Sequence, residues 1–135
     1  MKYYAVIDTN VLVSALITSN DEAATVQVLR KLLAGDVIPV YSLKVMDEYR
    51  EVLHRKKFNL DDKNIEILLA AIEKFGYYIE PSGTMEILPD MKDLPFYEIV
   101  LEIKDDNGYL VTGNQKHFPD RPYIVTARHI GSNKK

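Results

Sequence analysis

The chain has 135 residues, with 17 Lys and Arg against 20 Asp and Glu, a formal charge of −3, and no cysteine. This length predicts a single domain spanning residues 1–135, and the absence of cysteine excludes disulfide scaffolds, thiolate zinc sites and cysteine nucleophiles. The small negative charge excludes a polybasic nucleic-acid-binding protein and an acidic tail protein.

Strand and helix patterns alternate along the first half of the chain. The apolar run 3–7 predicts a buried strand, and residues 11–17 predict a short buried helix. Asp21 is the expected N-cap of a second helix that ends before Gly35. Residues 37–40 predict a strand, with Pro39 indicating an edge position or the end of the strand.

The alternation continues to the end of the chain. Ser42 is the expected N-cap of a helix that runs to about His54, and Asn59 or Asp61 opens a helix that Gly76 ends. Strands are expected at 77–79, 109–112 and 123–125. An amphipathic helix lies between the first two of these strands, because its apolar positions follow helical spacing: Phe96, Ile99, Val100 and Ile103. Strands separated by helices predict an α/β fold with a mostly parallel sheet covered by helices on both faces.

No segment approaches the ~20 apolar residues that a bilayer-spanning helix needs. Asp8 ends the first apolar run before it reaches the length of a signal-peptide core. We therefore expect a cytoplasmic protein without a membrane partner, its last few residues forming a flexible tail.

Charge is distributed unevenly. Residues 80–108 contain eight acidic side chains and two lysines, whereas residues 112–135 contain one acidic and five basic side chains. A second basic cluster is Arg55-Lys56-Lys57. Such patches are commonly solvated surface. The alternative is a pair of basic regions around an acidic centre, where the acids would have a specific role.

Four polar residues interrupt the apolar pattern. Asp8 and Asn114 each follow a predicted strand, at the sheet edge where open α/β folds bind ligands. Glu48 lies on the apolar stripe of its helix, and Asp93 precedes a predicted helix. Simpler explanations exist for each: a helix N-cap for Asp8, shared with Thr9 or Asn10; an N-cap for Asp93, in competition with Asp90; snorkelling to the edge of the apolar face, or a salt bridge, for Glu48; and a turn asparagine for Asn114.

Together these four side chains can converge on one crevice. Clustered carboxylates raise one another's pKa unless a cation neutralises them, and Mg²⁺ or Mn²⁺ prefers such oxygen ligands. Metal-assisted phosphodiester hydrolysis is the chemistry that follows. The histidines His54, His117 and His129 have no zinc-ligand spacing and are expected at the surface.

The order of these motifs resembles that of PIN domains. The matching segments are VIDTNVLVSA at 6–15, Ser42 followed by MDEYREVL at 46–53, DLPFYE at 93–98 and LVTGN at 110–114. The closer resemblance is to the bacterial PIN group described as toxins of toxin–antitoxin systems, and it covers essentially the whole chain.

The resemblance implies a Rossmann-like α/β/α sandwich of four to five strands and a metal-dependent ribonuclease. Asp8, Glu48 and Asp93 would be the catalytic metal-binding acids, and Asn114 would be a further metal ligand. Supporting positions would be Thr9, Asn10, Ser14 and Thr112. Many PIN domains have an aspartate where this chain has Asn114, and its neutral amide would bind a second metal only weakly.

We therefore expect an Mg²⁺- or Mn²⁺-dependent endoribonuclease that cleaves single-stranded RNA, with a cognate antitoxin as partner and a homodimeric state. The basic residues expected to bind RNA phosphates are Arg55, Lys56, Lys57, Lys116 and His117. Two alternatives stay open: a catalytically weak PIN fold that binds RNA or protein, and a metal-dependent phosphatase of small molecules.

Overall fold

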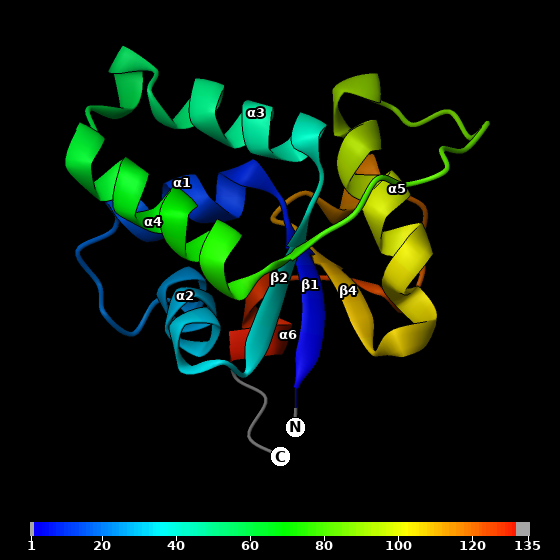
Figure 1. Cartoon of the computed structure of the whole chain (residues 1–135), viewed down its shortest axis with the longest axis horizontal. Helices are drawn as coiled ribbons and strands as arrows, with labels where there is room; N and C mark the ends of the chain where they lie inside the picture. Colours follow the sequence, from blue (N-terminus) through cyan, green and yellow to red (C-terminus); the bar gives the residue numbers. More distant parts are fainter. Residues whose placement is uncertain (1, 132–135) are drawn as a thin grey trace.

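A five-stranded parallel sheet lies at the centre of the computed structural model, which describes residues 2–131 (Figure 1). The strands are β1 (Tyr3–Ile7), β2 (Val37–Tyr41), β3 (Tyr77–Tyr78), β4 (Gly108–Val111) and β5 (Ile124–Val125). Their order is β3-β2-β1-β4-β5, and every neighbouring pair is parallel. The predicted α/β class is confirmed. The predicted flexible tail, with Lys134 and Lys135, lies outside the described residues.

Six α-helices and four short 3₁₀ helices surround this sheet. The α-helices are α1 (Thr9–Ile17), α2 (Ala24–Ala34), α3 (Leu43–Leu53), α4 (Asp62–Phe75), α5 (Leu94–Ile103) and α6 (Ala127–Gly131). The 3₁₀ helices are η1 (Lys56–Phe58), η2 (Met91–Asp93), η3 (Lys104–Asp106) and η4 (Gln115–His117). Figure 1 shows α2 and α4 on one side of the sheet and α5 on the other. No helix within residues 2–131 is long and apolar enough to cross a membrane.

Most predicted helix ends are confirmed. The Ser42 side chain accepts a hydrogen bond from the Val45 amide at the start of α3, and Asp61 accepts one from the Lys63 amide at the start of α4. Gly35 ends α2 in the left-handed conformation, with φ of 88°. Such backbone angles cost glycine little because it has no Cβ.

The predicted cap of α2 is wrong. This helix begins at Ala24, and Asp21 makes no capping hydrogen bond to it. Asn20 organises the preceding turn instead, because its side chain accepts the Glu22 amide and its carbonyl accepts the Ala23 amide. That turn moves the start of the helix three residues beyond Asp21.

The prediction of an edge strand at Pro39 is also wrong, since β2 lies between β1 and β3. Pro39 pairs in register with Ala5 of β1, whereas β3 pairs only with Val40 and Tyr41. One side of Pro39 therefore has no strand beside it. The missing N–H of proline is tolerated at such a position in an inner strand.

The strand order reverses at the carboxyl ends of β1 and β4. From β1 the chain first builds outward through β2 and β3, and it then returns to the other side of β1 with β4. Open α/β sheets bind ligands where the order reverses in this way. The residues directly after β1 and β4 are Asp8 and Thr112.

Candidate active site

Asp8 and Thr112 form a buried pair at the reversal of strand order. Asp8 is 5% exposed and Thr112 is 0% exposed. Ile7 pairs with Val111 in register, so the two polar residues occupy the next positions along neighbouring strands. The Thr112 hydroxyl donates to Asp8 Oδ2 over 2.7 Å. This hydrogen bond fixes the orientation of the Asp8 carboxylate.

Burial raises the pKa of the Asp8 carboxyl, because the charged form loses its hydration, and the hydrogen bond from Thr112 offsets part of this increase. The ionised carboxylate is therefore costly to keep at this position without a nearby cation. Asp8 also occupies the N-cap position of α1, as the simpler explanation expects, and the backbone amides of Thr9 and Asn10 lower its pKa. Its hydrogen bond from the Thr112 side chain is additional to this capping position.

Glu48 approaches Asp8 from α3. Its side chain is half-buried, in agreement with its place on the apolar stripe of the helix. Burial raises its pKa, Glu51 raises it further and Arg55 opposes the increase, while Asp8 and Asp93 add smaller contributions of the same sign as Glu51. The ion pairs within residues 2–131 do not include Glu48, so a salt bridge does not explain its position.

Tyr49 holds α3 against the end of β1. Its ring is 2% exposed, and its hydroxyl donates to the Ile7 carbonyl over 2.5 Å. The ring also contacts Phe96 of α5, with centroids 6.1 Å apart. Sequence analysis did not single out this residue. The available signal was a tyrosine on a buried helix stripe, whose hydroxyl must find a hydrogen-bond partner.

Asp93 comes from a third segment, at the junction of η2 and α5. It occupies the N-cap position of α5, but its carboxylate makes no capping hydrogen bond. Asp90 instead accepts the Lys92 amide. The Oδ2 atom of Asp93 lies 3.1 Å from Nδ1 of His117, whose N–H donates to it.

Burial also raises the pKa of Asp93. Asp8 and Asp90 add to the increase, and the hydrogen bond from His117 partly offsets it. The charge of His117 also lowers the pKa of Asp8. Asp8 and Asp93 thus lie close enough to Glu48 to raise its pKa, and Asp8 lies close enough to Asp93 to raise the pKa of that carboxyl.

His117 is not a simple surface residue, as the sequence predicted, but part of the candidate site. It is half-buried at the end of η4 and contacts Asp93, whereas His54 and His129 are exposed. His54 instead contacts Asp62 and Glu66 of α4. The structure therefore adds an imidazole to the candidate site, which sequence reasoning considered only as an RNA contact.

The remaining predicted site residues lie at different distances from Asp8. Asn114, the predicted further metal ligand, follows Thr112 closely, and its backbone N–H donates to the Thr112 hydroxyl over 3.0 Å. Thr9 is 3% exposed, and its Oγ1 has no hydrogen-bond partner within the described chain. Asn10 is exposed. Ser14 lies further along α1, and its hydroxyl is 3.3 Å from that of Thr25 in α2.

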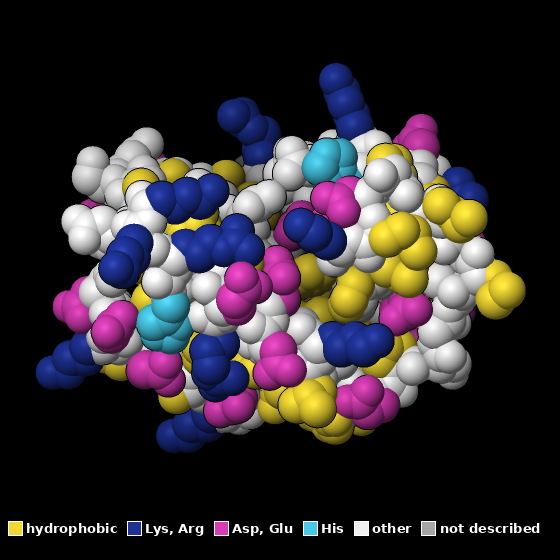
Figure 2. Space-filling model, turned by 90° about the horizontal axis from the view of Figure 1, so that it is seen from above, with side chains coloured by type: hydrophobic (Ala, Val, Ile, Leu, Met, Phe, Trp, Pro, Cys, Tyr) yellow, Lys and Arg dark blue, Asp and Glu magenta, His cyan; other side chains and the backbone are white. Residues whose placement is uncertain are grey.

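Basic side chains surround the acidic residues at this end of the molecule. Figure 2 looks onto the face formed by the carboxyl ends of the strands and shows Lys and Arg side chains around Asp and Glu near its middle. Arg55, Lys56 and Lys57 are exposed after α3, where Arg55 pairs with Glu51 at 3.2 Å. Lys116 is exposed on η4, next to His117.

The donor set suits Mg²⁺ or Mn²⁺, although residues 2–131 contain no group of three His, Cys, Asp or Glu side chains close enough to hold a metal ion. The available donors are carboxylate, amide and hydroxyl oxygens, which these hard cations prefer. The unpartnered hydroxyl of Thr9 and the raised pKa values of the acids are features that a bound cation would relieve.

Comparison with known proteins identifies the family. Neither the curated proteins nor the solved structures include a match to this chain. The PIN domain matches residues 4–116, a range that contains Asp8, Glu48, Asp93 and Asn114. PIN domains are generally metal-dependent nucleases. Since the match covers most of the chain, this protein belongs to the PIN domain family.

Proposed function

We propose that the protein is an Mg²⁺- or Mn²⁺-dependent endoribonuclease that cleaves single-stranded RNA. The observation that carries this proposal is that three separate segments bring Asp8, Glu48 and Asp93 together: Asp8 and Asp93 both raise the pKa of Glu48, and Asp8 also raises the pKa of Asp93. Membership of the PIN domain family supports nuclease activity. Exposed basic residues near the acids support a polyanionic substrate.

Each acid has a defined task. Asp8, Glu48 and Asp93 would hold the metal, and Asn114 would add a neutral amide oxygen. Thr112 orients Asp8, and His117 orients Asp93. The bound metal would lower the pKa of a water molecule and stabilise charge on the phosphoryl oxygens.

The remaining residues position the site and the substrate. Tyr49 holds α3, and with it Glu48, against the end of β1. Lys116 lies on the same 3₁₀ turn as His117, and it would bind a phosphate of the RNA strand near the acids. Arg55, Lys56 and Lys57 would contact more distant phosphates. Because these contacts are with phosphates, binding should weaken as the salt concentration rises.

The biological role that we propose is that of a toxin, inhibited by a cognate antitoxin in the cytoplasm and acting as a homodimer. The resemblance of its motifs to the bacterial toxin group supports this role. An apolar groove of about 230 Å³ between α1, α2 and α4 offers a protein contact, with Leu33 and Ile67 exposed by 61% and 60%. Light scattering of the wild type and of Ile67→Glu tests the dimer. A monomeric wild type would contradict it.

The nuclease activity is tested with a fluorescent single-stranded RNA. We expect cleavage that requires Mg²⁺ or Mn²⁺ and is abolished by Asp8→Asn and by Glu48→Gln. The control is Asp47→Asn, which removes an exposed acid from the same helix and should cleave like the wild type. Undiminished cleavage by both site variants would exclude the proposed site. Hydrolysis of a phosphate monoester without RNA cleavage would indicate the phosphatase.

A catalytically weak domain that binds RNA or protein is the second candidate. The observation in its favour is that a neutral asparagine stands at position 114, where its backbone N–H is bonded to Thr112 and where a carboxylate would bind metal more strongly. The variant Asn114→Asp separates the two candidates. Weak cleavage by the wild type with a large gain in the variant supports the binding role, whereas strong wild-type cleavage supports the nuclease.

A further inference from the structure

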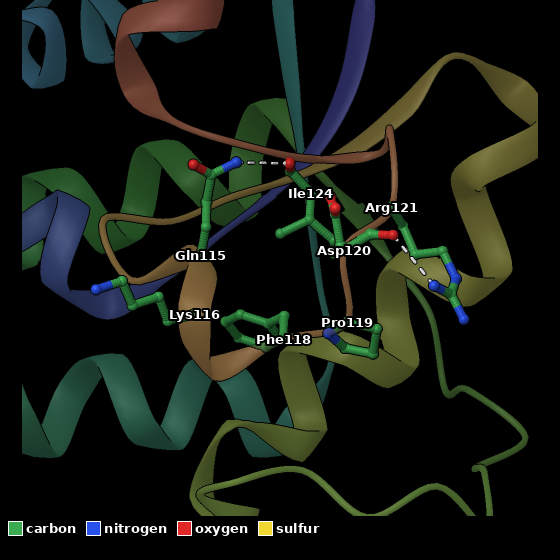
Figure 3. A pocket seen from close by; sticks show the side chains of 7 residues that line it. All are labelled: Gln115, Lys116, Phe118, Pro119, Asp120, Arg121 and Ile124. Carbon is green, nitrogen blue, oxygen red and sulfur yellow. Dashed lines mark hydrogen bonds between the residues drawn. The ribbon is translucent and has the colours of Figure 1, made fainter.

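A separate pocket of about 280 Å³ adjoins the candidate active site, between η4 and β5 (Figure 3). Its lining begins with Gln115 and Lys116, on the same short turn that places His117 against Asp93. A 3₁₀ helix rises only about 2 Å per residue. The pocket therefore lies close to Asn114, which is proposed to bind metal, and to His117, which contacts Asp93.

The pocket has apolar side chains on two of its sides, and these are held in place. Figure 3 shows Phe118 and Pro119 on one side and Ile124 on the other. Phe118 is only 6% exposed, and its ring contacts Tyr97 of α5 with centroids 6.3 Å apart. Gln115 Nε2 donates to the Ile124 carbonyl over 3.0 Å, which ties η4 to β5. Little rearrangement is therefore needed for a ligand to enter.

Cationic side chains stand at both ends of this pocket. Figure 3 shows Lys116 at one end and Arg121 at the other, with their charged groups directed outward. Arg121 is held by a hydrogen bond from its Nη1 to the Asp120 carbonyl over 3.1 Å. This arrangement matches a nucleotide strand, in which a base with apolar faces is flanked by a phosphate on each side.

Asp120 is the single acidic residue between Thr112 and Gly131, and it also lines the pocket. Its carboxylate has no ion pair among the described residues. A carboxylate opposes binding of a bare phosphate, but it accepts hydrogen bonds from the amino groups of bases. Its presence among basic neighbours therefore favours a base that carries an exocyclic amino group.

We propose that this pocket is a subsite for one unstacked nucleobase of the RNA, and that Asp120 makes it prefer bases with an exocyclic amino group, such as cytosine and adenine, over uracil, which has none. A pocket just below the about 300–1,000 Å³ of drug-sized ligand sites accommodates a group as small as one base. Single-stranded RNA is commonly recognised by such splayed bases, through apolar contact and hydrogen bonds to their edges. This inference rests on the proposed ribonuclease function, whose substrate specificity it would set.

The test measures binding of fluorescein-labelled C₆, A₆ and U₆ ribonucleotides by fluorescence anisotropy in EDTA, where metal-dependent cleavage cannot occur. We expect the wild type to bind C₆ and A₆ about tenfold more tightly than U₆, the scale of one specific base contact. Asp120→Asn should reduce this preference to less than threefold. Because the variant also removes a negative charge, its affinity for U₆ should stay the same or increase.

The phosphate contacts are tested in parallel. Lys116→Ala and Arg121→Ala should weaken binding of all three oligonucleotides by similar factors and reduce the salt dependence. Arg30→Ala is the matched control, because it removes an exposed charge on α2, away from the pocket. Circular dichroism of each variant checks that it is folded, and Asp120→Ser provides a second way to remove the carboxylate.

The outcomes separate this proposal from the proposed function. Equal binding of C₆, A₆ and U₆ by the wild type, or an unchanged preference in Asp120→Asn and Asp120→Ser, overturns the base subsite while RNA cleavage can still establish the nuclease. Loss of preference in both Asp120 variants supports the subsite even if no cleavage is detected with metal, in which case the nuclease function alone fails. Absence of RNA binding overturns the subsite.

Discussion

Nδ1 of His117 lies 3.1 Å from Oδ2 of Asp93, and this contact joins the turn after β4 to the start of α5. Asp93 is free for the contact because Asp90, three residues earlier, provides the capping hydrogen bond of η2. Two aspartates that compete for one role in the sequence therefore have different roles in the structure. Asp90 shapes the turn, and Asp93 contacts His117.

Replacing His117 with alanine should raise the pKa of Asp93 further. Burial already raises this pKa, and the hydrogen bond from His117 opposes the increase, so its removal leaves the ionised carboxylate less stabilised. The measurement is a pH titration of the aspartate carboxyl carbons by NMR, without metal. Affinity for Mn²⁺ at neutral pH should fall, which calorimetry can determine.

The matched control for this prediction is His54→Ala. His54 is an exposed histidine that contacts the Arg50 carbonyl and pairs with Glu66 on α4, away from Asp93. Its removal should leave both the Asp93 titration and the Mn²⁺ affinity unchanged. A titration curve of Asp93 that is identical in His117→Ala and the wild type would contradict the proposed positioning role.

Thr112→Val should destabilise the protein by about 1–3 kcal/mol, the cost of leaving a buried polar partner unsatisfied. The Thr112 hydroxyl donates to Asp8 and accepts the Asn114 amide, so the variant removes two hydrogen bonds while keeping the shape of the side chain. Urea denaturation measures the loss. Thr112→Ser keeps the hydroxyl and should recover most of the stability, and equal losses in the two variants would exclude the hydroxyl as the cause.

Tyr49→Phe should reduce cleavage more than it reduces stability. Its hydroxyl bond to the Ile7 carbonyl is worth about 1 kcal/mol to folding, but the same bond sets the distance between Glu48 on α3 and Asp8 after β1. Tyr97→Phe is the control, because it removes a hydroxyl bond to Glu86 in the loop before α5. A Tyr49→Phe enzyme with wild-type cleavage would show that this contact only stabilises the fold.

The sheet and most helices could be predicted because their determinants are local. Apolar runs such as residues 3–7 identify buried strands. Ser42, Asp61, Gly35 and Gly76 identify helix ends through capping chemistry that depends on neighbouring residues. The observed strand ends differ from the predicted ones by about a residue, because hydrogen bonding to the neighbouring strand decides where a strand ends. Thr112, for example, was predicted inside a strand and lies just beyond β4.

The features that could not be predicted depend on residues distant in the sequence. Pro39 is tolerated in an inner strand because β3 begins one residue further along, which only the tertiary pairing determines. The contact of His117 with Asp93 joins residues 24 positions apart and has no motif of its own. Asp8 and Glu48 could be identified from the sequence because each places a carboxylate in an otherwise apolar pattern. Burying a carboxylate costs free energy, so its presence there calls for a functional explanation.

The last prediction concerns the stability of the metal-free protein. The pKa of Asp8 is raised in the folded state relative to the unfolded chain, chiefly by burial. The folded state therefore binds more protons between the ordinary and the raised pKa, and the free energy of unfolding decreases as the pH rises through this interval. Asp8→Asn removes this penalty, so in EDTA at neutral pH its melting temperature should exceed that of the wild type.

This difference should shrink on acidification and disappear below the ordinary pKa of aspartate, where Asp8 is neutral in both states. With saturating Mn²⁺ the order should reverse, because metal at 100 times its Kd stabilises the wild type by about 2.7 kcal/mol and the variant lacks a ligand. Asp21→Asn is the control for general surface charge, since Asp21 is exposed in the loop before α2. A difference in melting temperature that does not depend on pH would contradict the proposed effect of burial on Asp8. Equal stabilisation of the wild type and Asp8→Asn by Mn²⁺ would remove Asp8 from the proposed ligand set.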